Sequence, residues 1–308
     1  MSIDRRTFIA TAGAACASAA AGSSLAHGAG GPLPGSPDPA DSPAANRAGW
    51  GRSRFAVNIE MWWGGMSFLD KIRAAHAAGF PAVEFWPWQG KPIDEARALI
   101  SELGIEVAQF TAWGFVPGLN DPKNHDSFER AIRDGCAVAK KLGCKKMTVV
   151  GGNDIAGKTA TEMHQNIIDG LKRAAPIAED EEVMLILEPM NIRVDHKGHC
   201  LYGSETGVAI CRAVDSPMVK LNWDLYHMQI SEGDLCGRLR DGYDQVGYLQ
   251  LADHPGRNEP GTGEIHYNRV LKEAWRLGYR GFIGLECSPR NGAEKAIERI
   301  KAADVWAP

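Results

Sequence analysis

From residue 54 to the C-terminus, short apolar runs alternate with longer segments in which apolar residues recur every three or four positions. Short runs rich in Val, Ile and Phe are typical of buried strands, whereas a 3.6-residue period is typical of amphipathic helices. The predicted strands cover residues 55–59, 82–85, 105–111, 146–150, 185–188, 219–223, 246–251 and 282–286. The predicted helices cover residues 67–78, 93–103, 125–142, 161–180, 204–213, 234–242, 267–277 and 293–303.

This alternation predicts eight strand–helix units in succession. Repeated units of this kind build a parallel sheet, and eight of them can close into a barrel. Glycine follows several predicted helices, at residues 79, 104, 143 and 278, where a left-handed turn can end the helix before the next strand. An open doubly wound sheet would normally carry a GxGxxG turn after its first strand, which this sequence lacks. We therefore predict an α/β fold, a single (β/α)8 TIM barrel, over residues 54–308.

The N-terminal segment does not follow the alternation. Asp4-Arg5-Arg6-Thr7-Phe8-Ile9 precedes a weakly apolar run, rich in Ala and Gly, that reaches Ala26. Two arginines before such a run are typical of a twin-arginine export signal, so we predict a signal peptide over residues 1–26. Residues 27–53 are rich in Pro, Gly, Ser and Ala and predict a flexible linker. The expected location is the periplasm, with no membrane attachment once the signal is cleaved.

Composition and charge narrow the classes of partner. The 308 residues are 44% apolar and 23% charged, as in ordinary soluble domains, and the formal net charge is −4. A nucleic-acid groove normally carries a basic excess, so we expect a small-molecule ligand and no nucleic acid. The cysteines after residue 26 form no CxxC pair, and we expect mostly free, buried thiols. The sequence leaves the formation of a homo-oligomer open.

The fifth to the eighth predicted strands each end in a polar residue: Glu188, Asp224, Gln250 and Glu286. The active site of a TIM barrel lies at the C-terminal ends of its strands, so these side chains should converge above the barrel axis. A buried carboxylate is costly unless something positive meets it. Oxygen ligands suit a divalent ion such as Mg²⁺, Mn²⁺ or Co²⁺, and we predict one such ion shared by the four residues. The alternative is that each acid caps a helix or pairs with a neighbouring base.

Further polar and aromatic residues near the predicted strand ends are candidates for substrate binding. A histidine one turn beyond an acid can contact a substrate oxygen, although it could equally be a core residue. An arginine in a long polar loop suits a bidentate grip on a carboxylate, although it could be a surface residue. Aromatic faces stack against small polyols, although tryptophan is often simply core. The candidates are His227, Arg257, Glu84, Trp62 and Trp113.

The strand-end motifs resemble those of the xylose-isomerase-like barrel superfamily of sugar isomerases and epimerases, and within it the hydroxypyruvate isomerase group. The motifs are Val83-Glu84-Phe85-Trp86, Leu187-Glu188-Pro189-Met190-Asn191, Asn222-Trp223-Asp224-Leu225-Tyr226-His227, Leu249-Gln250-Leu251-Ala252-Asp253 with Arg257, and Gly284-Leu285-Glu286. Tandem tryptophans and the export signal depart from the cytoplasmic enzymes of this group. The resemblance implies that Glu188, Asp224, Gln250 and Glu286 hold one divalent metal ion. It also implies that Glu188 and Glu286 face each other across the substrate as acid and base.

These features predict a metal-dependent isomerase of aldose–ketose type, an intramolecular oxidoreductase. Its expected substrate is a small hydroxy-carbonyl compound such as hydroxypyruvate, tartronate semialdehyde or a related keto-sugar, with proton transfer through an enediolate. A sugar epimerase or a dehydratase on the same scaffold is an alternative, and so is a non-catalytic periplasmic sugar-binding protein. AP endonucleases with a related barrel need three zinc ions, and this chain supplies too few strand-end histidines for them.

Overall fold

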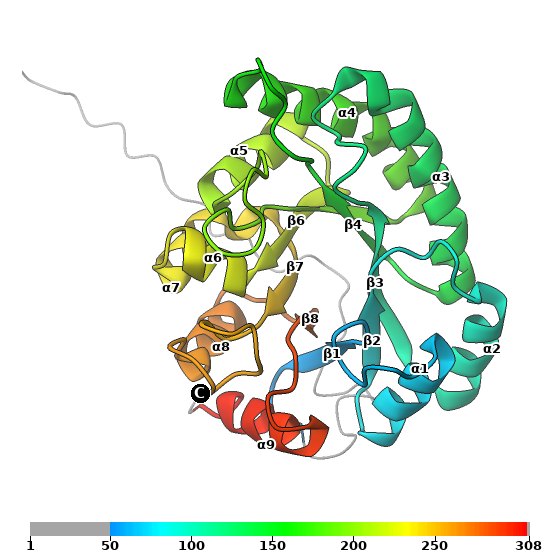
Figure 1. Cartoon of the computed structure of the whole chain (residues 1–308), viewed down its shortest axis with the longest axis vertical. Coiled ribbons are helices and arrows are strands. Elements are labelled where there is room, and N and C mark those ends of the chain that lie inside the picture. The colour runs from blue at the N-terminus through cyan, green and yellow to red at the C-terminus, as the bar shows by residue number, and fades with distance from the viewer. Residues whose placement is uncertain (1–49, 307–308) are drawn as a thin grey trace, which may run out of the picture. The chain divides into compact units, whose positions relative to one another are not determined.

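Eight parallel strands form a closed barrel surrounded by helices in the computed structural model, which describes residues 50–306 (Figure 1). Each strand pairs in parallel with the next, and β8 pairs with β1 to close the ring. The strands are β1 (Arg54–Asn58), β2 (Ala82–Phe85), β3 (Glu106–Trp113), β4 (Lys146–Val150), β5 (Met184–Glu188), β6 (Val219–Asp224), β7 (Val246–Leu251) and β8 (Phe282–Leu285). The predicted (β/α)8 barrel is confirmed.

The helices follow the strands in the predicted order, with ends within two residues of the predicted ones. They are α1 (Phe68–Ala77), α2 (Ile93–Leu103), α3 (His125–Leu142), α4 (Ala160–Glu181), α5 (Ser204–Val214), α7 (Leu235–Gly242), α8 (Tyr267–Arg276) and α9 (Ala293–Ala303). Short 3₁₀ turns, η2 (Pro122–Asn124) and η3 (Tyr243–Gln245), precede α3 and β7. The helix α6 (Leu225–Ser231), directly after β6, was not predicted from the sequence.

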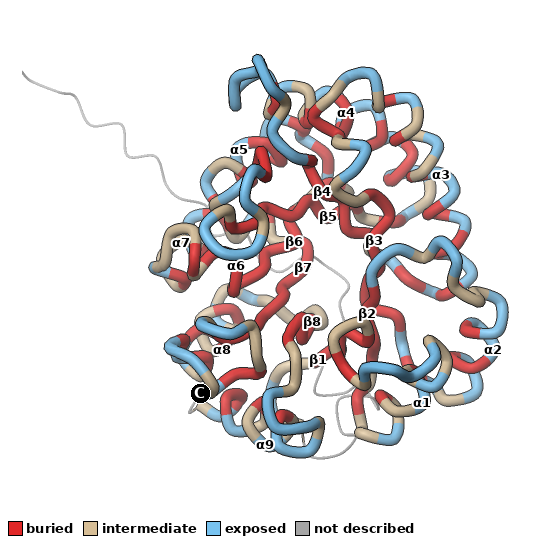
Figure 2. Tube along the Cα trace, viewed as in Figure 1, coloured by how far each residue is buried: buried red, intermediate tan, exposed pale blue. Residues whose placement is uncertain are grey.

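Local signals in the sequence set where several helices begin and end. Thr159 caps the start of α4 through a capping box, in which its hydroxyl accepts from the backbone N–H of Glu162 while the Glu162 carboxylate accepts from that of Thr159. Gly104 and Gly143 end α2 and α3 in the left-handed conformation, at φ of 61° and 67°. The inward faces of the helices and the outward faces of the strands are buried together, and exposed residues lie on the outer helical surface (Figure 2).

The barrel interior changes character along its axis. Ala56, Ala82, Ala108, Ile186 and Tyr248 form a separate apolar cluster. Strand side chains alternate between the two faces, so residues two positions further along also point into the barrel. Those residues include Asn58, Glu84, Glu188 and Gln250. A polar level therefore lies above the apolar one, toward the C-terminal ends of the strands.

Glu84 is the centre of this polar level and has no exposed surface. Its carboxylate accepts hydrogen bonds from Asn58 Nδ2 at 3.1 Å, Gln109 Nε2 at 3.3 Å, Tyr248 OH at 2.8 Å and Gln250 Nε2 at 2.8 Å. A buried carboxylate without such donors would be strongly destabilising. The network therefore fixes the side chains immediately beneath the strand ends.

The described chain begins at Trp50, so the predicted signal peptide and most of the predicted linker lie outside the described residues. Trp50 Nε1 donates to the Gly79 carbonyl at 2.9 Å, and the Ser53 hydroxyl donates to Asp304 Oδ1 at 2.6 Å. These last linker residues are therefore attached to the barrel. The cysteines of the described chain are free, and all but Cys236 are buried, as predicted. Within residues 50–306, no helix combines the length and the apolar character needed to cross a membrane.

Glycine at position 284 makes room for the Glu84 network. A Cβ at Gly284 would lie 2.3 Å from Glu84 Oε2 and 2.8 Å from Gln250 Cγ. We expect Gly284→Ala to lower the free energy of unfolding by about 1–3 kcal/mol, because the network must shift to admit the methyl group. Urea unfolding measures this change. Gly64→Ala is the matched control, since a Cβ there meets nothing within 4 Å; equal stability of the two variants would contradict the expectation.

Candidate active site

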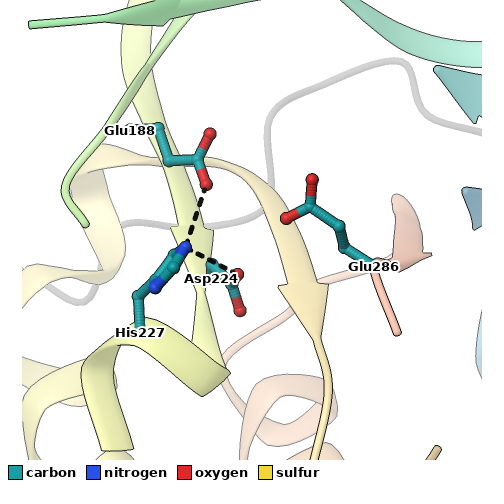
Figure 3. A group of neighbouring side chains, drawn as sticks. All are labelled: Glu188, Asp224, His227 and Glu286. Atoms are coloured by element: carbon teal, nitrogen blue, oxygen red, sulfur yellow. Dashed lines mark ion pairs between the residues drawn. The ribbon is translucent and has the colours of Figure 1, made fainter. Parts of the chain in front are cut away.

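Three carboxylates and one imidazole converge at the C-terminal ends of the second-half strands. Glu188 ends β5, Asp224 ends β6, His227 lies in the first turn of α6, and Glu286 directly follows β8. All four side chains are buried, and each offers an atom within 4.8 Å of the others. Figure 3 shows Glu188 and Glu286 on opposite sides, with Asp224 and His227 beside them. The predicted convergence of these three acids is therefore found in the structure.

Glu286 is held by a donor on each of its two oxygens. Trp86 Nε1 donates to Oε1 at 2.7 Å, and Arg257 Nη2 donates to Oε2 at 2.8 Å. The Arg257 guanidinium also lies over the Tyr226 ring, 5.1 Å from its centroid, and 3.9 Å from Asp224 Oδ2. These contacts orient Glu286 toward the cluster and place one positive charge beside the acids.

Asp224 has one oxygen committed to the fold and one oxygen free. Its Oδ1 accepts from the backbone N–H of Tyr226 at 2.8 Å, which caps the N-terminus of α6. Its Oδ2 is buried and has no hydrogen-bond partner within the described chain. The short helix α6 also turns His227 back toward Asp224, so that Nε2 lies 3.5 Å from Oδ2.

His227 is fully buried beside the acids. Its Nε2 lies 3.7 Å from Glu188 Oε1, and its Nδ1 lies 2.7 Å from Asn191 Nδ2. Burial and then the positive charge of Arg257 hold the pKa of His227 well below its ordinary value. Both causes favour the neutral form of the imidazole.

Burial and electrostatic repulsion raise the pKa values of Asp224, Glu84 and Glu188. Burial, then the charge of Glu286, raises the pKa of Asp224 from 3.8 to about 7. The same two causes raise the pKa of Glu84 from 4.5 to about 7. Burial, then Glu286 and Asp224, hold the pKa of Glu188 well above its ordinary value. Arg257 opposes these shifts only in part, so the cluster carries uncompensated negative charge when ionised.

Gln250 and Glu84 lie in the polar level beneath the cluster. Both ends of the Gln250 amide are engaged, because Nε2 donates to Glu84 and Oε1 accepts from Asn222 Nδ2 at 2.6 Å. Coordination of a metal by the second lone pair of Oε1 stays a prediction. Glu84 has no exposed surface and four donors, so it supports the site, and a direct substrate contact finds no support.

The two predicted tryptophans pack into the barrel wall. Trp62 is fully buried, with its ring against Trp63 and edge-on to Phe80. Trp113 is only 8% exposed and packs edge-on against Phe128 of α3. Rings with so little exposed surface leave little area for stacking on a ligand, and the contacts in the structure are those of packing residues.

Two residues that contact the cluster were not among the predicted site residues. Trp86 is 38% exposed and hydrogen-bonds Glu286, and Asn191 is fully buried and contacts His227. Both belong to motifs already singled out, since Trp86 follows β2 and Asn191 follows Glu188 by three positions. Their position after a strand end was the available signal, whereas their partners depend on loop conformation.

The comparison with known families agrees with this geometry. Residues 72–303 match the family described as xylose isomerase-like TIM barrel. The chain belongs to this family. The resemblance seen in the strand-end motifs is thereby confirmed at the level of the family.

Individual relatives cover nearly the whole barrel. The chain is 31% identical over 250 residues to hydroxypyruvate isomerase of Escherichia coli (strain K12), with 79% of this chain and 96% of that protein covered. It is 33% identical over 255 residues to 2-oxo-tetronate isomerase of Cupriavidus necator, with 80% and 97% covered. Together with the family, these relatives identify the chain as an isomerase.

Solved structures share the same barrel. A crystal structure described as AP endonuclease, family 2, from Brucella melitensis superposes with a TM-score of 0.75 at 25% identity, covering 80% of this chain and 96% of that chain. D-psicose 3-epimerase from Clostridium cellulolyticum H10 superposes with a TM-score of 0.68 at 20% identity, covering 81% and 96%. The second likeness shows the fold alone.

The raised pKa values predict that the metal-free protein loses stability as pH rises. A carboxyl group with a raised pKa binds its proton more tightly in the folded state, so its stabilising contribution is lost on deprotonation. For Asp224 and Glu84 the window runs from their ordinary pKa values of 3.8 and 4.5 to about 7. In EDTA, we expect the melting temperature to fall across this window, between about pH 4 and pH 7. Asp224→Asn should weaken this decline, and an unchanged slope in that variant would contradict the assignment.

Proposed function

We propose that the protein is a metal-dependent isomerase of small hydroxy-keto acids, with hydroxypyruvate, tartronate semialdehyde or a related keto-sugar acid as substrate. The observation that carries the proposal is the pair Glu188 and Glu286, which face each other beside Asp224 at the strand ends (Figure 3). Hydroxypyruvate and 2-oxo-tetronate are the substrates named for its relatives, and both are small hydroxy-keto acids. We also propose export to the periplasm, on the evidence of the N-terminal sequence alone.

The donor set fits a divalent cation. Three buried carboxylates repel one another, as the raised pKa values of Glu188 and Asp224 indicate, and Asp224 Oδ2 has no hydrogen-bond partner in the described chain. Glu188, Asp224 and Glu286 would hold Mg²⁺, Mn²⁺ or Co²⁺, and Gln250 is the predicted fourth ligand. When bound, the ion would supply positive charge that stabilises the negative charge developing on a substrate oxygen.

Glu188 and Glu286 are placed to move the proton. Isomerisation removes a proton from the carbon beside the carbonyl group, forms an enediolate and returns a proton to the neighbouring carbon. One carboxylate would accept the proton and return it, or the two would act as base and acid from opposite sides. Trp86 and Arg257 fix the two oxygens of Glu286, which limits its rotation during the transfer. The Arg257 guanidinium, beside Asp224 and Glu286, would also pair with a carboxylate of the substrate.

An epimerase or a dehydratase is the second candidate. An epimerase needs a proton-transferring group on each face of the substrate, and the opposed Glu188 and Glu286 satisfy that requirement as well. A dehydratase would release a product lighter by one water. A sugar-binding protein without activity would leave substrate protons unexchanged in deuterated water. Product mass and stereochemistry therefore separate these functions.

Removing the proton-carrying ability of Glu286 should abolish turnover. We expect Glu286→Gln to lower kcat by at least about 10²–10⁴-fold, because an amide cannot accept the proton while its shape keeps the Trp86 contact. Mass spectrometry of deuterium incorporation from solvent measures the loss. Glu294→Gln, on the exposed start of α9, is the matched control. Proton exchange by Glu286→Gln at the control's rate would refute the role.

Activity should depend on an added divalent ion. After dialysis against EDTA, we expect no exchange with hydroxypyruvate or other small keto-acids, and recovery on adding Mg²⁺, Mn²⁺ or Co²⁺. The recovery follows because Glu188, Asp224 and Glu286 repel one another unless a cation lies between them. Asp224→Asn should need a higher metal concentration for half-maximal recovery. Full activity of the EDTA-treated protein would contradict metal dependence.

A further inference from the structure

The orientation of the Asn191 side-chain amide is determined by the backbone. Asn191 Oδ1 accepts hydrogen bonds from the backbone N–H of Val194 at 3.0 Å and of Asp195 at 3.2 Å. A backbone N–H can only donate, so this end of the amide must be the oxygen. The Nδ2 end therefore faces Asp195 Oδ2 at 2.7 Å and His227 Nδ1 at 2.7 Å.

This contact determines the tautomer of His227. In a neutral imidazole one nitrogen donates a hydrogen bond and the other accepts one. Asn191 Nδ2 is a donor, so His227 Nδ1 must accept, and the proton lies on Nε2. Nε2 is buried with no hydrogen-bond partner in the described chain, 3.5 Å from Asp224 Oδ2 and 3.7 Å from Glu188 Oε1. The imidazole thus presents an N–H group between two carboxylates.

His227 looks like a fourth metal ligand when only proximity is considered. A histidine coordinates a metal through a nitrogen lone pair, however, and the nitrogen that faces the acids carries the proton. We propose that Asn191 is a positioning residue that holds His227 in the Nε2–H form, which is the form that can donate a hydrogen bond in the predicted contact with a substrate oxygen and that has no Nε2 lone pair for a metal ion. The substrate part of this proposal rests on the proposed isomerase function, whereas the tautomer rests on protein contacts alone.

A neutral donor at this position has a chemical use. Enediolate formation places negative charge on substrate oxygens, and a preorganised N–H stabilises such charge. The donor also leaves the Glu188 and Asp224 carboxylates free to bind a cation, because a neutral imidazole does not compete as a positive charge. Asn191 reaches His227 from the loop that directly follows Glu188, so one segment fixes both groups.

The tautomer can be measured in the full chain without metal or substrate. In EDTA at neutral pH, long-range ¹H–¹⁵N correlation distinguishes protonated from unprotonated imidazole nitrogens, and the loss of signals in His227→Gln assigns the residue. We expect a protonated Nε2 and an unprotonated Nδ1. The opposite tautomer in the wild-type protein would overturn the proposal.

An amide–carboxylate exchange tests the role of Asn191 at constant charge. In Asn191→Asp/Asp195→Asn the carboxylate at position 191 still accepts the backbone N–H groups, but it now accepts from His227 Nδ1 as well. We expect the tautomer to reverse to Nδ1–H and kcat to fall about 10–100-fold with a smaller change in KM. Asp195→Asn alone keeps Asn191 in place and should retain the Nε2–H form. An unreversed tautomer, or wild-type kcat with a reversed one, would overturn the proposal.

Metal affinity gives a third readout that is independent of activity. If His227 is a donor, His227→Gln should bind Mn²⁺ within about tenfold of the wild-type affinity. A loss of several orders of magnitude would make His227 a ligand and overturn the proposal. Failure of the proposed function has a different signature: no proton exchange with any hydroxy-keto acid by the wild-type protein, while the tautomer is as expected.

Discussion

The mutual repulsion of three buried carboxylates is the constraint on which the site depends. Glu188, Asp224 and Glu286 come from three different strand ends, yet the closure of the barrel brings them within 4.8 Å. Water cannot screen them there, and the one nearby guanidinium offsets only part of their charge. Hydrogen-bond donors in the surrounding structure offset part of this cost. Trp86 and Arg257 donate to Glu286, and the backbone N–H of Tyr226 donates to Asp224. These donors offset only part of the repulsion among the three carboxylates, and a bound cation would offset more of it.

The sequence predicted the barrel well because strand and helix patterns are local. Alternating apolar runs and amphipathic segments gave eight units whose ends differ from the structure by no more than two residues. The barrel topology then converted sequence positions into spatial ones, since every parallel strand ends at the same rim. For this reason the convergence of Glu188, Asp224 and Glu286 can be predicted from the sequence.

The remaining features depend on tertiary contacts, which the periodicity of apolar residues along the sequence does not predict. The helix α6 has seven residues, too short for a clear amphipathic pattern, and it begins because Asp224 caps it. Trp62 follows β1 and Trp113 ends β3, where a ligand-stacking residue can lie, but tertiary packing buries both rings in the core. The Asn191–His227 and Trp86–Glu286 hydrogen bonds join segments distant in sequence, so only the folded chain reveals them.

The reacting groups come from one half of the barrel, and some of the residues that support them come from the other half. Glu188, Asp224, His227 and Glu286 all belong to the half from β5 onward, whereas Trp86 and the carboxylate of Glu84 are contributed by β2 and the segment just after it. Part of the alignment of Glu286 is therefore encoded in a different stretch of the gene from the reacting groups, whereas Arg257 and Asn191 are encoded in the same half as those groups. Substitutions in the first stretch can retune how Glu286 is presented while every proton-carrying group stays in place, which leaves this scaffold room to acquire new substrates without first losing its chemistry.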